Sequence, residues 1–164
     1  MSMISWAEVC ASPHLKDLPS KIETNRFGKI MMSPSFLWHG GFQSRIGSLL
    51  DSMMSLGHVI TECAIETTDG TRVADVAWIS KDRLAPYKKA FSLPIAPEIC
   101  VEIISNSNSR EEMTGKMQLY FAAGAQEVWF CDESGKMEFH ASDMIGPLPA
   151  SKLCEAFPKQ LETL

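Results

Sequence analysis

The sequence predicts one α/β domain of the α+β type, with a central mixed β-sheet flanked by helices and a β-hairpin near the N-terminus. Three observations support this class. Short runs of β-forming residues alternate with two amphipathic helical segments, an order typical of layered sheet-and-helix domains. The chain has 164 residues, which suits one hydrophobic core and is too short for two. Its 45% apolar and 21% charged residues are the proportions of an ordinary globular protein.

The first elements are a short helix and a hairpin. Residues 1–20 are weakly patterned, so we expect a short helix followed by a loop. In 21–32, β-forming residues flank a turn at 25–28, which indicates a hairpin. From Phe42 to Met53, apolar residues recur at helical spacing, and Gly40-Gly41 is interpreted as the turn before this helix.

The middle of the chain predicts three strands. The segments 58–66 and 71–80 have strand composition, and the turn residues Thr68-Asp69-Gly70 join them. A polar loop with three prolines follows. Residues 98–104 then form a nearly continuous apolar run, which is typical of a strand covered on both faces.

The last part predicts a second helix and a second hairpin. Ser109 with Glu112 three residues later is the pattern of a helix N-terminus, and Gly124 marks the expected end of that helix. The segments 127–131 and 136–140 flank turn residues, which indicates a hairpin.

Cysteine usage and charge argue against several classes of protein. The five cysteines are odd in number and never form C-x-x-C, so neither a disulfide framework nor a zinc ribbon is expected and a cytoplasmic location is favoured. No stretch approaches the roughly 20 apolar residues of a membrane-spanning helix. The first residues lack the basic-then-apolar pattern of a secretory signal. The net charge of −5 provides no strong nonspecific attraction to nucleic acid.

Two acidic residues stand where strands are expected to be buried. Asp75 and Glu102 lie in the middle of apolar runs, where an ionised carboxylate is costly unless it is paired or binds a metal. If the two strands are neighbours, side-chain alternation can bring both carboxylates to one face of the sheet. Three explanations remain open. The first is a salt bridge to Arg72, Lys116 or Arg110, or exposure at a strand end. The second is an acid and base pair as in glycoside hydrolysis, and the third is a site for a hard cation such as Mg²⁺ or Mn²⁺.

Lys116 is the basic residue best placed to assist a cation site. In the predicted helix it lies one turn from both Glu112 and Tyr120. Its ammonium group would stabilise the negative charge that develops on a phosphate. An exposed ion pair with Glu112 is the alternative.

Several short motifs follow one another in a recognisable order over about residues 22–140. They are Glu23 and Gly28, His39, Val73-Ala74-Asp75, Val101-Glu102-Ile103-Ile104-Ser105, Arg110, Glu112, Lys116, Tyr120, Gly124, Glu127, Trp129 and Asp132. In order and spacing the chain resembles the PD-(D/E)XK nuclease superfamily, and within it the Uma-type family of restriction endonucleases. No single motif is specific, whereas their combination is.

The resemblance implies a restriction-endonuclease-like core over 21–145, between an N-terminal segment, 1–20, and a C-terminal tail, 146–164. It implies that Asp75 and Glu102 bind Mg²⁺ or Mn²⁺ and that the Ile103 carbonyl is a backbone ligand. Ile104 occupies the position of the usual superfamily lysine, so catalysis would depend on Lys116.

The same resemblance implies further site residues. Glu23 would complete the catalytic set. His39, Arg110 and Tyr120 are the candidate substrate contacts, although His39 and Tyr120 would also suit capping and packing.

The implied function is a metal-dependent endonuclease that hydrolyses phosphodiester bonds in DNA, with a metal-activated water as the nucleophile. A homodimer is one option, because enzymes that cut both strands are often symmetric and Met53 and Met54 offer apolar surface. The alternative function is a catalytically silent binding or assembly module that keeps the nuclease fold.

Overall fold

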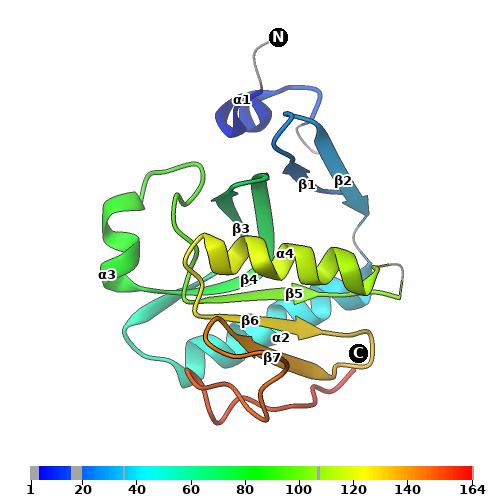
Figure 1. Ribbon diagram of the computed structural model, residues 1–164, viewed down its shortest axis with the longest axis vertical. Helices are drawn as coiled ribbons and strands as arrows, with labels where there is room; N and C mark the ends of the chain where they lie inside the picture. The colour runs from blue at the N-terminus through cyan, green and yellow to red at the C-terminus, as the bar shows by residue number, and fades with distance from the viewer. Residues whose placement is uncertain (1–3, 16–19, 35, 107, 164) are drawn as a thin grey trace.

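The protein is built around a five-stranded sheet with helices on both faces and a two-stranded hairpin beside it (Figure 1). The computed structural model describes residues 4–15, 20–34, 36–106 and 108–163. The elements are α1 (Trp6–Ala11), β1 (Ser20–Thr24), β2 (Ile30–Pro34), α2 (Leu37–Met53), β3 (Gly57–Thr67), β4 (Gly70–Ser80), α3 (Lys81–Leu84), η1 (Ala85–Tyr87), β5 (Ile99–Ile103), α4 (Arg110–Ala122), β6 (Glu127–Cys131) and β7 (Met137–Ala141). None of the helices in these ranges is long and apolar enough to cross a membrane.

The main sheet is mixed. Its strands lie in the order β3-β4-β5-β6-β7. β5 and β6 are parallel and α4 crosses over between them, whereas the other neighbouring pairs are antiparallel. β1 and β2 form a separate antiparallel pair, and β1 lies beside β4. The predicted fold class, a mixed sheet with flanking helices and an N-terminal hairpin, is confirmed.

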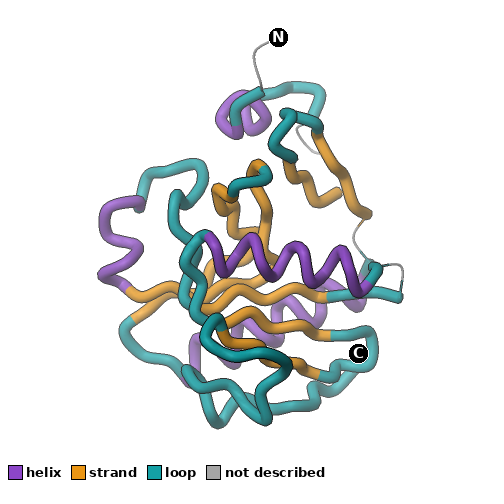
Figure 2. The backbone as a smooth tube through the Cα atoms, viewed as in Figure 1, coloured by secondary structure: helices purple, strands orange, loops and turns teal. Residues whose placement is uncertain are grey.

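Two hydrophobic clusters cover the two faces of the sheet. α2 packs on one face through Phe42, Ile46 and Leu50. α4 packs on the other face through Met113 and Tyr120. Figure 2 shows the two helices on opposite sides of the strands. All residues of β5 and all but the end residues of β4 are buried, as expected for central strands that are covered on both faces.

One helix begins earlier than the sequence predicts. α2 begins at Leu37, so Gly40 and Gly41 lie inside the helix and their interpretation as a preceding turn is wrong. Trp38 contacts Phe42 one turn later, with ring centroids 6.2 Å apart. Such packing offsets the helix propensity that each glycine costs, about 1 kcal/mol relative to alanine.

The proline-containing loop after β4 also differs, because it holds the short helix α3 and the turn η1. The Ser80 hydroxyl caps α3 by accepting a hydrogen bond from the Arg83 N–H. A helix of four residues is too short to show a hydrophobic period, which is why the sequence pattern did not reveal it.

The segment after β7 packs against the α2 face of the sheet. Leu148, Cys154, Phe157 and Leu161 are buried in the same cluster as Phe42. The Leu161 N–H donates to the Gly135 carbonyl at 2.8 Å, which ties the segment to the turn between β6 and β7. The predicted C-terminal tail therefore contributes to the core.

Candidate active site

Asp75 and Glu102 lie opposite each other on neighbouring strands. β4 and β5 are paired as far as Val76 and Val101, and one further step places Asp75 opposite Glu102. Their residues are 1% and 4% exposed. Side-chain alternation puts both carboxylates on the face that α4 covers. The structure thus brings together two buried acids that lie far apart in the sequence.

Two lysine ammonium groups contact these carboxylates. Lys21 Nζ, from β1, lies 2.6 Å from Asp75 Oδ1 and 3.3 Å from Glu102 Oε2. Lys116 Nζ, from α4, lies 2.9 Å from Glu102 Oε2 and 2.8 Å from Glu23 Oε1. Lys116 therefore points into the protein and does not form the alternative surface pair with Glu112. The hairpin, the sheet and α4 together build one charged cluster.

The remaining carboxylate oxygens are held by neutral donors and by a histidine. The Ile103 N–H donates to Asp75 Oδ2 at 2.7 Å, and His39 Nε2 lies 3.3 Å from the same oxygen. The Tyr120 hydroxyl donates to Glu102 Oε1 at 2.6 Å. Each of the two acids is therefore held through both of its oxygens, which fixes the orientation of the carboxylates.

The backbone of Asp75 is held from the other face of the sheet. Glu62, in β3, lies across from Asp75 and has a φ of 51°, in the left-handed region. At this point Gln43 Nε2, from α2, donates to the Asp75 carbonyl at 2.9 Å and to Glu62 Oε1 at 2.7 Å. Neither Gln43 nor Glu62 carries a signal in the sequence that separates it from an ordinary surface residue.

The cluster shifts the pKa values of its acids in opposite directions. Burial raises the pKa of Asp75, but the charge of Lys21 and the contact with His39 outweigh burial and hold this pKa well below its ordinary value. For Glu102, burial and the neighbouring carboxylates outweigh the two lysines, so its pKa is raised. Burial lowers the pKa of Lys21, and the three surrounding carboxylates more than compensate, so its pKa is raised as well.

The charged cluster faces a cavity of about 230 Å³. Phe36 and Trp38 form one wall, at the start of α2, and Ser105 and Asn108 form another, between β5 and α4. His39 also lines the cavity, and within the described ranges its buried Nδ1 has no hydrogen-bond partner.

The structure brings most of the predicted site residues to this cavity. Those that line it are Glu23, His39, Asp75, Glu102, Ile103 and Lys116. Tyr120 lies behind Glu102 and is fully buried. Arg110 lies outside the cavity and lines a neighbouring hollow of about 340 Å³, which shares Ser105, Asn108 and Met113 with it.

Lys21 is the residue of the cluster that sequence reasoning missed. A signal was present, because residues two apart in a strand point to the same side and Lys21 stands two before Glu23. The Val73 N–H donates to Glu23 Oε1 at 2.7 Å, which links this side of β1 to β4.

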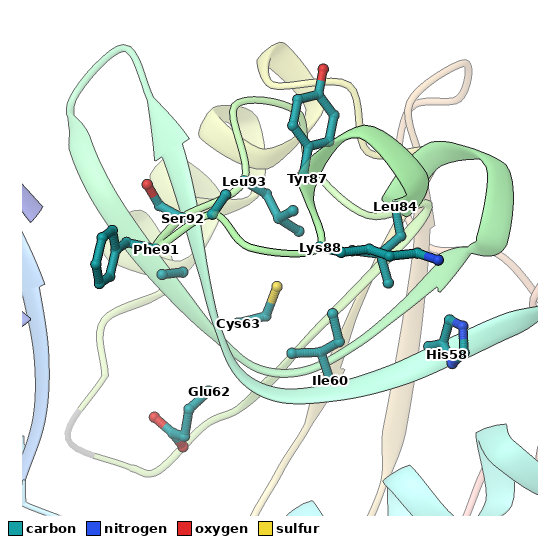
Figure 3. A pocket seen from close by; sticks show the side chains of 12 residues that line it. His58, Ile60, Glu62, Cys63, Leu84, Tyr87, Lys88, Phe91, Ser92 and Leu93 are labelled. Carbon is teal, nitrogen blue, oxygen red and sulfur yellow. The ribbon is translucent and has the colours of Figure 1, made fainter. Parts of the chain in front are cut away.

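Two other features of the described ranges, the buried Glu127 and a second hollow, lack this chemistry. Glu127 is fully buried, but it accepts hydrogen bonds from Trp129 Nε1, the Ser151 hydroxyl and two backbone N–H groups, so neutral donors satisfy it. A larger hollow of about 530 Å³ lies between β3 and residues 84–93. Its lining is largely apolar, and the Glu62 carboxylate points away from it (Figure 3).

The donor set fits a hard divalent cation. Carboxylate oxygens of Asp75 and Glu102 converge on one position, and a cation, the ammonium group of Lys21, already contacts both. Within the part of the chain that the structure describes, no group of three His, Cys, Asp or Glu side chains forms a ready-made metal centre. The oxygens of this pair are nevertheless the ligand type that Mg²⁺ and Mn²⁺ prefer.

Comparisons with known proteins agree with the sequence resemblance. The model of a family described as "Uma2: Putative restriction endonuclease" matches residues 13–160. A crystal structure described as "a putative nuclease belonging to DUF820", from Anabaena variabilis ATCC 29413, shares the fold with a TM-score of 0.74 and 19% identity, over 97% of this chain and 94% of that chain. No curated protein matches. The family match spans most of the sequence, and the chain belongs to the Uma2 family.

Proposed function

We propose that the protein is a divalent-metal-dependent endonuclease that hydrolyses phosphodiester bonds in DNA, with its catalytic centre at the charged cluster. The observation that carries this proposal is the convergence of Asp75 and Glu102 on one cation position, with the Lys116 ammonium group 2.9 Å from Glu102. The family membership supports a nuclease. The five cysteines are all free, which suits the cytoplasm.

Asp75 and Glu102 would hold Mg²⁺ or Mn²⁺, with the Ile103 carbonyl as a third ligand. The bound ion would lower the pKa of a water molecule and neutralise charge on the phosphate. The ordinary pKa of an aspartate, 3.8, already leaves Asp75 ionised at neutral pH, and the site lowers this pKa further. The hydroxyl of Tyr120 positions Glu102 by binding the oxygen that faces away from the lysines.

Lys116 would stabilise the negative charge that builds on the phosphate as the bond to the leaving oxygen breaks. Glu23 lies 2.8 Å from its ammonium group and positions it. Because the Lys116 side chain is only 13% exposed, its charge acts in a poorly solvated site, where electrostatic interactions are stronger than in water.

The substrate would enter through the cavity beside His39. His39 lines this cavity, and within the described ranges its buried Nδ1 has no hydrogen-bond partner. Arg110 begins α4 at the neighbouring hollow, where it would contact a phosphate that flanks the scissile bond. Tyr120 is too deeply buried to touch DNA, so we assign it the positioning role only.

One observation favours the alternative, a catalytically silent module with a nuclease fold. Both acids are already paired with lysines of the same chain, an arrangement that also suits a purely structural network. A silent module would bind its partner without cutting DNA.

A plasmid-nicking assay separates the two functions. The purified protein is incubated with supercoiled DNA and Mg²⁺ or Mn²⁺, beside Asp75→Asn, Glu102→Gln and Lys116→Met. Glu111→Gln is the matched control, since Glu111 is exposed on the same helix. Nicking is expected in the parent and the control, and is expected to fall by at least about 10²-fold in the three site variants. Cleavage that survives in all three would contradict the proposal, and absence of cleavage in the parent would favour the silent module.

A further inference from the structure

The ammonium group of Lys21 fills the position on which Asp75 and Glu102 converge. It lies 2.6 Å from one carboxylate and 3.3 Å from the other. The proposed divalent cation would be bound by these same two carboxylates. Two cations cannot share them, because like charges a few ångströms apart repel strongly in a poorly solvated site.

The charge balance of the cluster favours an exchange. The three carboxylates of Glu23, Asp75 and Glu102 face two ammonium groups, so the cluster keeps one negative charge. Replacing one ammonium group by a divalent cation makes the cluster neutral. Lys21 Nζ lies between the two carboxylates, so this side chain has to move away before a divalent cation can bind there.

Lys21 is the lysine that can leave. Among the described residues, Lys116 pairs with Glu23 and Glu102 but not with Asp75, so a cation between Asp75 and Glu102 leaves the contact of Lys116 with Glu23 in place. Lys21 contacts both Asp75 and Glu102, belongs to a hairpin that is not part of the main sheet, and lines the cavity as Lys116 does. Its long, flexible stem gives the ammonium group a route into that cavity.

The hairpin itself can stay in place during this movement. Three residues beyond Lys21, the Thr24 hydroxyl accepts a hydrogen bond from the Thr71 N–H at 3.1 Å, and the Arg72 guanidinium donates to the Thr24 carbonyl. Glu23 is bound to the backbone of Val73. A change in the Lys21 side chain alone is therefore sufficient.

We infer that Lys21 is a built-in counter-ion that competes with the divalent cation for Asp75 and Glu102, so that metal loading requires its displacement. This inference rests on the proposed function. Without metal, Lys21 offsets part of the negative charge of the buried acids and stabilises the fold. With metal, the same side chain is released toward the cavity that the substrate would enter.

Calorimetric titration with Mn²⁺ tests the competition without measuring activity. The titration compares the parent protein with Lys21→Met, which keeps an unbranched side chain of similar length and removes the charge. Lys29→Met is the matched control, because Lys29 is exposed on the same hairpin. Lys21→Met is expected to bind Mn²⁺ about tenfold or more tightly than the parent, and Lys29→Met is expected to bind like the parent.

A second measurement uses the parent protein and does not depend on whether Lys21→Met folds. In ¹H–¹⁵N spectra of lysine side chains, a buried and hydrogen-bonded ammonium group gives a signal that a solvated one loses by exchange with water. Mg²⁺ is expected to remove the Lys21 signal and to retain that of Lys116.

The outcomes separate this inference from the proposed function. Equal or weaker Mn²⁺ binding by Lys21→Met, or a Lys21 signal that persists at saturating Mg²⁺, overturns the competition while the metal site of the parent stands. Absence of Mn²⁺ binding in both proteins overturns the competition and the metal site together.

Discussion

Removing the hydroxyl group of Tyr120 is expected to destabilise the protein by about 2 kcal/mol. This hydroxyl donates to Glu102 Oε1 at 2.6 Å, and both residues are buried. A hydrogen bond to a charged group contributes roughly 1.5–3 kcal/mol, and losing it leaves one oxygen of a buried acid without its donor. Phenylalanine fills the space of the ring, so Tyr120→Phe creates no sizeable cavity. The lysine contacts of the other Glu102 oxygen remain, which places the expected value near the middle of the range.

Urea unfolding followed by circular dichroism at neutral pH measures this change. In thermal unfolding of a domain of this size, a loss of about 2 kcal/mol in the free energy of unfolding lowers Tm by roughly 4–8 °C. Tyr87→Phe is the matched control, because Tyr87 is the one other tyrosine in the sequence and its hydroxyl points away from the larger hollow (Figure 3). Its stability is expected to stay within about 0.5 kcal/mol of the parent.

Equal stabilities of Tyr120→Phe and Tyr87→Phe would contradict a stabilising hydrogen bond from the Tyr120 hydroxyl to Glu102. Glu102 would then not depend on the Tyr120 hydroxyl, and the orientation of this carboxylate toward the lysines would need another cause. In the nicking assay, a positioning role for Tyr120 is expected to lower kcat and to leave KM nearly unchanged.

Three further predictions concern the acids, the backbone strain and the substrate path. Because Asp75 has a pKa below its ordinary value of 3.8, its ionised form stabilises the fold above that pH and loses this effect as the pH falls below it. The stability deficit of Asp75→Asn, measured by urea midpoints, is therefore expected to be largest near neutral pH and to shrink on acidification, and a deficit independent of pH would contradict this. Glu62 has a left-handed φ of 51°, which glycine adopts more easily than valine. Although strands usually favour valine over glycine, Glu62→Gly is therefore expected to have a higher Tm than Glu62→Val, by an amount equivalent to about 1 kcal/mol. A higher Tm for the valine variant would show that this strain is absent. Arg110→Ala is expected to weaken DNA binding equally for all sequences and to reduce the slope of log K against log salt by about 1, whereas an unchanged slope would remove Arg110 from the DNA path.

The acids of the site could be predicted because they conflict with their surroundings. A carboxylate in an apolar strand is costly, so Asp75 and Glu102 stand out in the sequence without any knowledge of the fold. The two carboxylates come together because β4 and β5 are neighbours in the sheet. The alternation of side chains along each strand is compatible with this strand order but does not predict it. Glu127 shows the limit of this reasoning, since it is equally buried and is satisfied by neutral donors.

Lys21 and Gln43 could not be assigned in the same way. Lys21 reaches the site because the hairpin packs beside β4. Gln43 reaches it because α2 packs on the opposite face of the sheet. Periodicity indicates which face of an element is apolar, but it does not show where a polar side chain at the edge of that face ends up. The fold itself was largely predictable, because the two long helices, α2 and α4, show a period and turn residues mark the ends of the strands. The early start of α2 was missed because glycine pairs usually mark a turn.

Anomalous diffraction from crystals of the protein soaked in Mn²⁺ shows directly whether Asp75 and Glu102 bind a divalent cation between them. We expect a single strong peak between the two carboxylates, within coordination distance of an oxygen of each, with the Lys21 ammonium group displaced. A map without a peak at this position, with Lys21 still bridging the two acids at saturating Mn²⁺, would contradict binding at these carboxylates.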